Sequence, residues 1–180
     1  RRARGGRLPP GLRHGSVASM TSSHIIEFLT VNIAVESLAA SVPTYQRLGL
    51  GDIEPVQFPD PPIEMTDVSM CLPGTAALSL IEPWSGGGPV GKFINRRGPG
   101  VYSIAFRVDD LVATMHDWSA AGFSWVSPAP VAVPGGRAGG YAADQAAMNW
   151  LPPKSVDGVL IEVFELTGNV RLLSSPDESR

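Results

Sequence analysis

Residues 101–123 read VYSIAFRVDDLVATMHDWSAAGF and carry the clearest structural pattern in the chain. The first eight residues are rich in β-branched and aromatic side chains and predict a strand. Asp110 is placed to cap a helix that stops at Gly122. The apolar face of that helix consists of Leu111, Met115 and Trp118. Three more strands are predicted at SWVSPAPV (124–131), AAMNWL (146–151) and VLIEVFEL (159–166), which gives the order β-α-β-β-β.

The same order of elements occurs earlier in the chain. Residues 25–35 (IIEFLTVNIAV) predict a strand, and residues 36–51 (ESLAASVPTYQRLGLG) predict a helix with a glycine stop. Short strands follow at 54–58, 66–72 and 76–81, and the last two are separated by a Pro-Gly-Thr turn at 73–75. The two halves share a pattern but little identity, which indicates an internal duplication of about 65 to 70 residues.

The sequence therefore predicts an α+β protein in which two tandem βαβββ modules form a curled mixed sheet around a cleft. The modules are expected at 23–83 and 100–168, joined by a Gly- and Pro-rich linker at 84–99 with a short helical turn around 90–95. Residues 1–22 are expected to be a basic tail or an extension before a start at Met20, and residues 169–180 a second tail.

Composition and charge exclude several classes of function. The 180 residues carry 14 Lys and Arg against 17 Asp and Glu, and five of the arginines lie within residues 1–13, so the rest of the chain is acidic. An acidic body argues against a nucleic-acid surface. No apolar run reaches the roughly eighteen residues of a membrane span. The single Cys71, expected to be buried, permits no internal disulfide, and with no secretion signal we expect a cytoplasmic location. The richness in Ala, Gly, Pro and Val is compatible with a bacterial source.

Several segments of the sequence resemble those of the vicinal oxygen chelate (glyoxalase/bleomycin resistance/dioxygenase) superfamily. Within that superfamily they most resemble the methylmalonyl-CoA epimerases. The matching segments are VNIAVESLAASVPTYQRLGL (31–50), ALSLIEP (77–83), GKFINRRGPGVYSIAFRVDDLVATMHDWSAAGF (91–123) and PPKSVDGVLIEVFE (152–165). The resemblance implies the same tandem βαβββ fold and chemistry next to a carbonyl group.

The family's metal site does not carry over to this sequence. The resemblance implies a divalent metal held by one side chain from each of four strands, and three of those positions are replaced here. The four corresponding residues are Thr30, Ser79, Ser103 and Glu162. Because one carboxylate and three neutral hydroxyls are poor ligands for zinc or cobalt, we expect no metal and no other cofactor.

The resemblance implies two acids that transfer protons from opposite sides of the substrate. Glu162 is the first. Asp67 is the nearest acid in the strand that matches the second, and Glu64 is a poorer candidate. A cleft would desolvate Glu162 and raise its pKa. Two interpretations of the three hydroxyls stay open: they hold a substrate oxygen in place of the metal, or they are remnants of a degenerate site. Asn32 and Trp150 are further expected substrate-binding residues, completing the set Thr30, Asn32, Ser79, Ser103 and Trp150.

Other residues carry weaker signals. Tyr102 alternates with Ser103 and is expected to point toward the helix layer. His24 precedes the first strand and is expected to be exposed, and His116 lies on a helix with no acid or nucleophile spaced for a catalytic triad. Four bases are candidates for contact with a CoA phosphate at the mouth of the cleft: Lys92, Arg96, Arg97 and Lys154.

Three functions are compatible with these features. The first is a metal-independent, isomerase- or lyase-like enzyme that moves a proton next to a carbonyl of an acyl or polyketide-like molecule, such as an acyl thioester. The second is a binding protein of the same fold that sequesters a small molecule. The third is an inactive partner subunit. A homodimer is expected in the enzyme and the binding protein alike.

Overall fold

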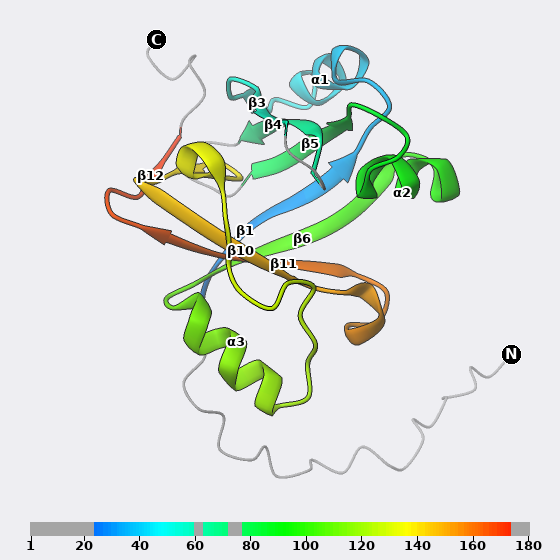
Figure 1. Cartoon of the computed structure of the whole chain (residues 1–180). Helices are drawn as coiled ribbons and strands as arrows, with labels where there is room; N and C mark the ends of the chain where they lie inside the picture. Colours follow the sequence, from blue (N-terminus) through cyan, green and yellow to red (C-terminus); the bar gives the residue numbers. More distant parts are fainter. Residues whose placement is uncertain (1–23, 60–62, 72–76, 174–180) are drawn as a thin grey trace, which may run out of the picture.

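The computed structural model of the chain describes residues 24–59, 63–71 and 77–173. The expected basic tail at 1–22 and the turn at 73–75 lie outside these residues. Most strands join one large mixed sheet in the order β2-β4-β5-β1-β6-β11-β10-β7, with β3 paired to β4 (Figure 1). The strands from the N-terminal half are β1 Ile25–Ala34, β2 Gly51–Asp52, β3 Val56–Phe58, β4 Met65–Cys71 and β5 Ala77–Pro83. Those from the C-terminal half are β6 Gly100–Val108, β7 Val131–Ala132, β10 Gln145–Leu151 and β11 Leu160–Thr167.

The pairing of strands repeats between the two halves, in agreement with the predicted α+β fold. In each half the first long strand pairs in parallel with the last, β1 with β5 and β6 with β11. The halves meet where β1 and β6 pair antiparallel at the centre of the sheet. A single continuous sheet therefore spans both halves.

The two equivalent helices start in the same way. Ser37 caps α1 (Leu38–Gln46) and Asp110 caps α3 (Leu111–Ala120), each with a side-chain oxygen that accepts a backbone N–H. A glutamate on the last long strand of each half then accepts the first helical N–H. Glu82 accepts from Leu38 at 2.6 Å, and Glu165 accepts from Leu111 at 2.9 Å.

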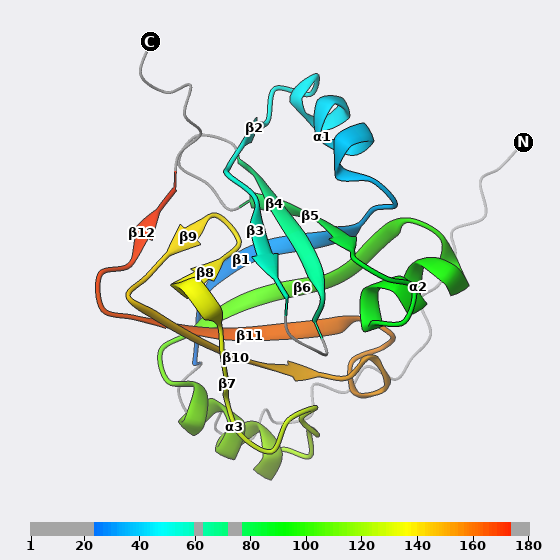
Figure 2. The ribbon, with the colours of Figure 1, turned by 45° about the horizontal axis from the view of Figure 1, so that its top comes forward.

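The helices cover separate parts of the sheet (Figure 2). α1 packs its apolar residues on Val35, Val68 and Leu80, whereas α3 packs on Val108 and Val163. A further core cluster lies between the large sheet and the segments that cross over it. This last cluster borders the cavity described below.

Two segments differ from the prediction. Of the strand expected at 124–131, the structure forms only the two-residue β7, because Pro128 and Pro130 cannot donate to a strand ladder. Fully buried Asn149 holds this segment instead, accepting from Ser127 N at 3.1 Å and donating to Ser127 O at 2.9 Å.

The second difference is a small sheet that the pattern of the sequence did not predict. It consists of β8 Arg137–Ala138, β9 Tyr141–Ala142 and β12 Arg171–Leu172, in the order β12-β9-β8. β12 falls in the segment expected to be a tail. The linker contains a longer helix than expected, α2 Pro89–Arg97, and short 3₁₀ turns occur at η1 Pro134–Gly136 and η2 Pro153–Ser155. In the described part of the chain, no helix is both long and apolar enough to cross a bilayer.

Candidate active site

One cavity of about 270 Å³ lies on the concave side of the sheet and is lined by both halves of the chain. Most of its lining is apolar, from residues such as Phe58, Met148 and Phe164. Its polar lining includes Thr30, Asn32, Asp67, Ser69, Arg137 and Glu162. Of the predicted site residues, the structure therefore places Thr30, Asn32, Asp67, Trp150 and Glu162 on the wall of this cavity.

Glu162 lies on β11, is only 9% exposed, and is held by a chain of side-chain hydrogen bonds. Asn32 donates to the Ser103 hydroxyl at 2.8 Å, and Ser103 donates to Glu162 Oε1 at 2.8 Å. Desolvation raises the pKa of Glu162 to about 7, although the bonds from Ser103 and Asn32 act in the opposite direction. A carboxyl group with this pKa can accept or release a proton near neutral pH.

Asp67 lies on β4 and faces the same cavity, and its Oδ1 is buried with no hydrogen-bond partner in the described part of the chain. Desolvation raises the pKa of Asp67 to about 7, and the charge of Glu162 adds to this increase. A hydrogen bond with Ser79 and the charge of Arg137 oppose it. Asp67 is thus a second carboxyl group whose proton is available near neutral pH.

The curl of the sheet brings these two carboxyl groups to one cavity. β4 and β11 are separated in the sheet by β5, β1 and β6. In a flat sheet, four strand spacings would put them about 19 Å apart. Since both groups line the same cavity, the sheet must curl enough to bring β4 and β11 to its two sides.

The four residues that the resemblance matches to the family's metal ligands lie on neighbouring strands, β5, β1, β6 and β11, and contact one another in pairs on one side of the sheet. The Thr30 hydroxyl has a single proton and two possible acceptors, the Ser79 hydroxyl at 3.4 Å and Val31 O at 3.2 Å. Ser79 and Ser103 are fully buried and do not line the cavity. Their hydroxyls contact other protein side chains, which places them behind the wall that Thr30 and Asn32 form.

This donor set does not fit a transition-metal ion. It offers one carboxylate and three hydroxyls that are engaged in hydrogen bonds within the protein, whereas zinc and cobalt prefer imidazole and thiolate. Among the residues that the structure describes, no group of three or more His, Cys, Asp or Glu side chains is placed to hold a metal.

Tyr102 departs from its predicted orientation. Simple alternation would turn Tyr102 away from the cavity, yet it lines the cavity together with Trp150, which was predicted to do so. The reason is a bulge: Asn32 pairs with Ser103, but Ile33 pairs with Val101, so Tyr102 is an extra residue on β6. A bulge of this kind is not visible in the alternation of apolar and polar residues.

Arg137 was missed entirely by sequence reasoning. It lies on β8, in the segment PGGRAGG (134–140), and lines the cavity opposite residues of the large sheet. The only signal in the sequence is the pair of double glycines around it. Such a pattern is typical of a chain that must turn tightly against other backbone.

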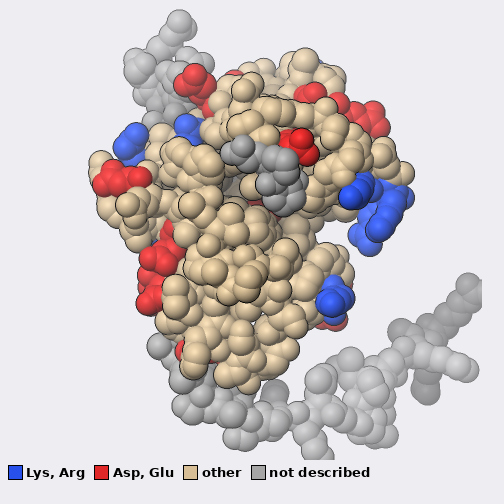
Figure 3. Space-filling view, viewed as in Figure 1, with Lys and Arg blue, Asp and Glu red and all other residues tan. Residues whose placement is uncertain are grey.

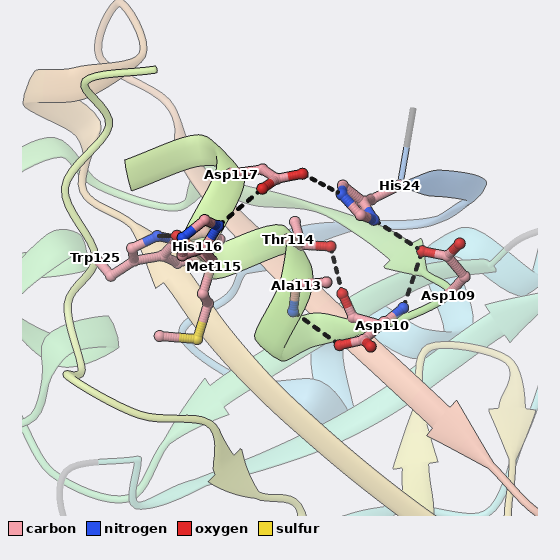
Figure 4. A network of polar contacts seen from close by, with 9 residues as sticks. All are labelled: His24, Asp109, Asp110, Ala113, Thr114, Met115, His116, Asp117 and Trp125. Carbon is pink, nitrogen blue, oxygen red and sulfur yellow. Dashed lines mark hydrogen bonds and ion pairs between the residues drawn. The ribbon is translucent and has the colours of Figure 1, made fainter. Parts of the chain in front are cut away.

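A second polar network lies outside the cavity, at the start of β1 and along α3 (Figure 4). His24 contacts Asp109 at 3.2 Å and Asp117 at 3.0 Å, and its side chain is 13% exposed, so the expectation of an exposed His24 was wrong. The hydrogen bond with Asp117 is the main cause that raises the pKa of His24. His116 is 83% exposed and contacts Asp117. This network ties α3 to the beginning of β1.

Comparisons with known proteins agree with the fold. A model of the glyoxalase/bleomycin resistance protein/dioxygenase superfamily matches residues 30–143. Methylmalonyl-CoA epimerase from Mycobacterium tuberculosis has 25% identity and a TM-score of 0.71, over 84% of this chain and 95% of that one. A hypothetical protein from Bacillus halodurans C-125 has 26% identity and a TM-score of 0.69, over 81% and 97%.

Methylmalonyl-CoA epimerase from Streptomyces coelicolor, in complex with 2-nitronate-propionyl-CoA, has 23% identity and a TM-score of 0.69, over 80% of this chain and 99% of that one. At this identity the likeness concerns the fold alone. No curated protein matches the chain by sequence.

Proposed function

Because the chain belongs to the glyoxalase/bleomycin resistance protein/dioxygenase superfamily, we propose that it is an enzyme that moves a proton next to a carbonyl group. Its substrate is an acyl or polyketide-like small molecule, and the reaction is an isomerisation or epimerisation that uses no metal ion. The observation that carries this proposal is the pair of carboxyl groups, Glu162 and Asp67, in one cavity with pKa values of about 7.

The electrostatic coupling between the two acids favours a state with one proton. Ionised Glu162 raises the pKa of Asp67, so near neutral pH one group is a carboxylate while the other holds its proton. The carboxylate removes a proton from the carbon next to the carbonyl, the electron pair of the broken C–H bond forms a C=C bond, and the π pair of the C=O bond moves to oxygen. The protonated group then returns a proton to the same carbon from the other side.

Asn32 is the cavity residue that holds the substrate oxygen, through the second N–H of Nδ2, in the place where relatives in the family use a metal. Thr30 lines the cavity beside it and would donate to the substrate by giving up its bond within the protein. One preorganised donor of this kind contributes about 2.7–4 kcal/mol to transition-state stability. Ser103 and Ser79 act behind them, since Ser103 orients Glu162 and Ser79 hydrogen bonds to Asp67.

An acyl thioester fits the surroundings of the cavity. Pro89 and Val90 at the start of α2 line the cavity, and the same helix carries exposed Lys92, Arg96 and Arg97. Lys and Arg side chains gather over α2 and near η2 at the right-hand margin in Figure 3. These bases, with Lys154 on η2, would contact the phosphate groups of a carrier such as CoA.

The proposal is tested by hydrogen–deuterium exchange at the carbon next to the carbonyl. Propionyl thioesters of CoA and of N-acetylcysteamine are incubated with the protein in D₂O, and loss of the α-proton signal is followed by NMR. The wild type is expected to catalyse exchange, and Glu162→Gln and Asp67→Asn to lower its rate by about 100-fold or more. Glu36→Gln, which changes an exposed acid, serves as the matched control. Equal exchange rates in the wild type and in Glu162→Gln would refute the proposed catalytic function.

A second candidate function is binding without catalysis, favoured by the apolar wall of the cavity and its aromatic residues Phe58, Tyr102 and Trp150. A binding protein would retain the thioester's affinity in Glu162→Gln and would show no exchange in any variant.

We also propose that the protein is a cytoplasmic homodimer. Sedimentation of the purified protein measures its oligomeric state and so tests the dimer.

A further inference from the structure

The cavity contains an arginine that forms no ion pair in the described part of the chain. Arg137 on β8 lines the cavity, and its Nε is buried without a hydrogen-bond partner. Within residues 24–59, 63–71 and 77–173, no carboxylate lies close enough to Arg137 to form an ion pair. A buried, unsatisfied guanidinium N–H is costly to the fold. Such a group is therefore expected to gain its partner from a ligand.

Arg137 is held in place by close backbone contacts. Gly139, two residues further on, has a φ of +53°, and a Cβ added there would lie 3.2 Å from Thr30 Cβ. Its carbonyl oxygen accepts a 2.8 Å hydrogen bond from Ser69 on β4. A Cβ on Gly136 would lie 2.2 Å from Ala143 O. The strand that carries Arg137 is thus fixed against both β1 and β4, so the backbone at Arg137 is in place before a ligand binds.

The proposed reaction would move negative charge within this cavity. When the Glu162 carboxylate takes a proton from carbon, Glu162 becomes neutral and the charge appears on the substrate's carbonyl oxygen as an enolate. Arg137 lines the same cavity as both carboxyl groups, and its charge acts on Asp67, so the guanidinium lies beside the space that a substrate would occupy. Negative charge that leaves Glu162 for an oxygen nearer to Arg137 gains stabilisation in the transition state that it lacked in the ground state.

We infer that Arg137 is a catalytic residue whose guanidinium binds the enolate oxygen of the substrate and supplies the positive charge that a metal ion supplies elsewhere in the family. This inference rests on the proposed function. The bonds balance without another reactant. A C–H bond breaks as an O–H bond forms on Glu162, the C–H electron pair becomes the C=C bond of the enolate, and the C=O π pair moves to oxygen. Asp67 then gives its proton to the carbon, the C=O bond forms again, and exchange with water restores the proton on Asp67 and removes the one on Glu162.

The test uses a neutral probe, propionyl-N-acetylcysteamine, so that any effect of Arg137 does not come from a carboxylate on the substrate. Arg137→Met is expected to lower kcat for exchange in D₂O by about 100-fold or more while KM stays within about twofold. Arg137→Lys, which keeps the charge but loses the planar fork, should lose less. Guanidinium ion added to Arg137→Ala should restore part of the lost rate.

The control is Arg171→Met, which removes an exposed arginine from the same small sheet and changes the net charge equally. Thermal unfolding of each variant checks that the fold is intact, and the rescue by guanidinium reports on a protein that is folded. The inference is overturned if Arg137→Met exchanges the neutral probe at the wild-type rate. It is also overturned if Arg137→Met affects only a carboxylated probe, succinyl-N-acetylcysteamine, through KM. Absence of exchange in the wild type would instead refute the proposed function on which it rests.

Discussion

Ser103 and Glu162 lie on neighbouring parallel strands, and the Ser103 hydroxyl donates a 2.8 Å hydrogen bond to Glu162 Oε1. This bond stabilises the carboxylate and lowers the pKa of Glu162 against the effect of desolvation. Since Asn32 donates to the same Ser103 hydroxyl, the direction of the Ser103 bond is fixed. The acid and its supporting hydroxyl are two of the four residues that the resemblance in sequence matches to metal ligands of the family.

Ser103→Ala is expected to raise the pKa of Glu162. If Glu162 is the base, the acidic limb of the pH–rate profile for α-proton exchange will move to higher pH, with little change at the alkaline plateau. A titration of the Glu162 carboxyl carbon by NMR measures the same shift without activity. Ser155→Ala, in the turn η2 and outside the cavity lining, is the control and should leave both curves unchanged. A profile that stays in place would show that Ser103 does not act on Glu162.

Glu162→Gln is expected to stabilise the fold at pH 8 and not at pH 4. The pKa of Glu162 is about 7 in the folded state and 4.5 in the unfolded state. Between pH 4.5 and pH 7, Glu162 therefore keeps its proton in the folded state and has lost it in the unfolded state. Stability therefore falls as pH rises through this window and levels off above it, at a total cost of about 3 kcal/mol. Urea unfolding at pH 4, 6 and 8 measures the difference. A constant difference would contradict the raised pKa.

Glu82→Ala and Glu165→Ala are each expected to destabilise the fold by about 1–3 kcal/mol, because each leaves the first N–H of its helix without an acceptor. The helices α1 and α3 lie in different halves, so the two effects should add in the double variant. Urea unfolding measures them. An effect at one position and none at the other would show that the two caps are not equivalent.

Gly139→Ala is expected to lower both stability and the exchange rate, whereas Gly158→Ala should lower stability alone. Both glycines have positive φ, +53° and +91°, so alanine introduces backbone strain of about 1–2 kcal/mol at each. Only at Gly139 does the new methyl group also meet a neighbour, Thr30. Unfolding curves of the two variants measure the backbone strain that they share. Their exchange rates measure the displacement of the strand that carries Arg137, which is expected in Gly139→Ala alone. Equal exchange rates in both variants would argue against that displacement.

The architecture was largely predictable because it depends on patterns with a fixed period. The strand at 101–108, the Asp110 cap and the Gly122 stop all appear where local chemistry requires them. The positions of Thr30, Ser79, Ser103 and Glu162 on one side of the sheet came from resemblance. What escaped prediction depends on contacts between distant residues: the bulge that turns Tyr102 inward, the capture of residues 127–129 by Asn149, and the small sheet that carries Arg137. None of these leaves a periodic signal in the sequence.

The antiparallel pairing of β1 with β6 runs through the middle of the cavity wall, with Asn32 directly opposite Ser103. Cutting the chain within residues 84–99 would give two fragments, each with a long unsatisfied edge. Neither fragment alone would contain both Asp67 and Glu162. Fragment complementation would thus restore the cavity only when the halves reassemble, and recovered catalysis would report directly on that reassembly.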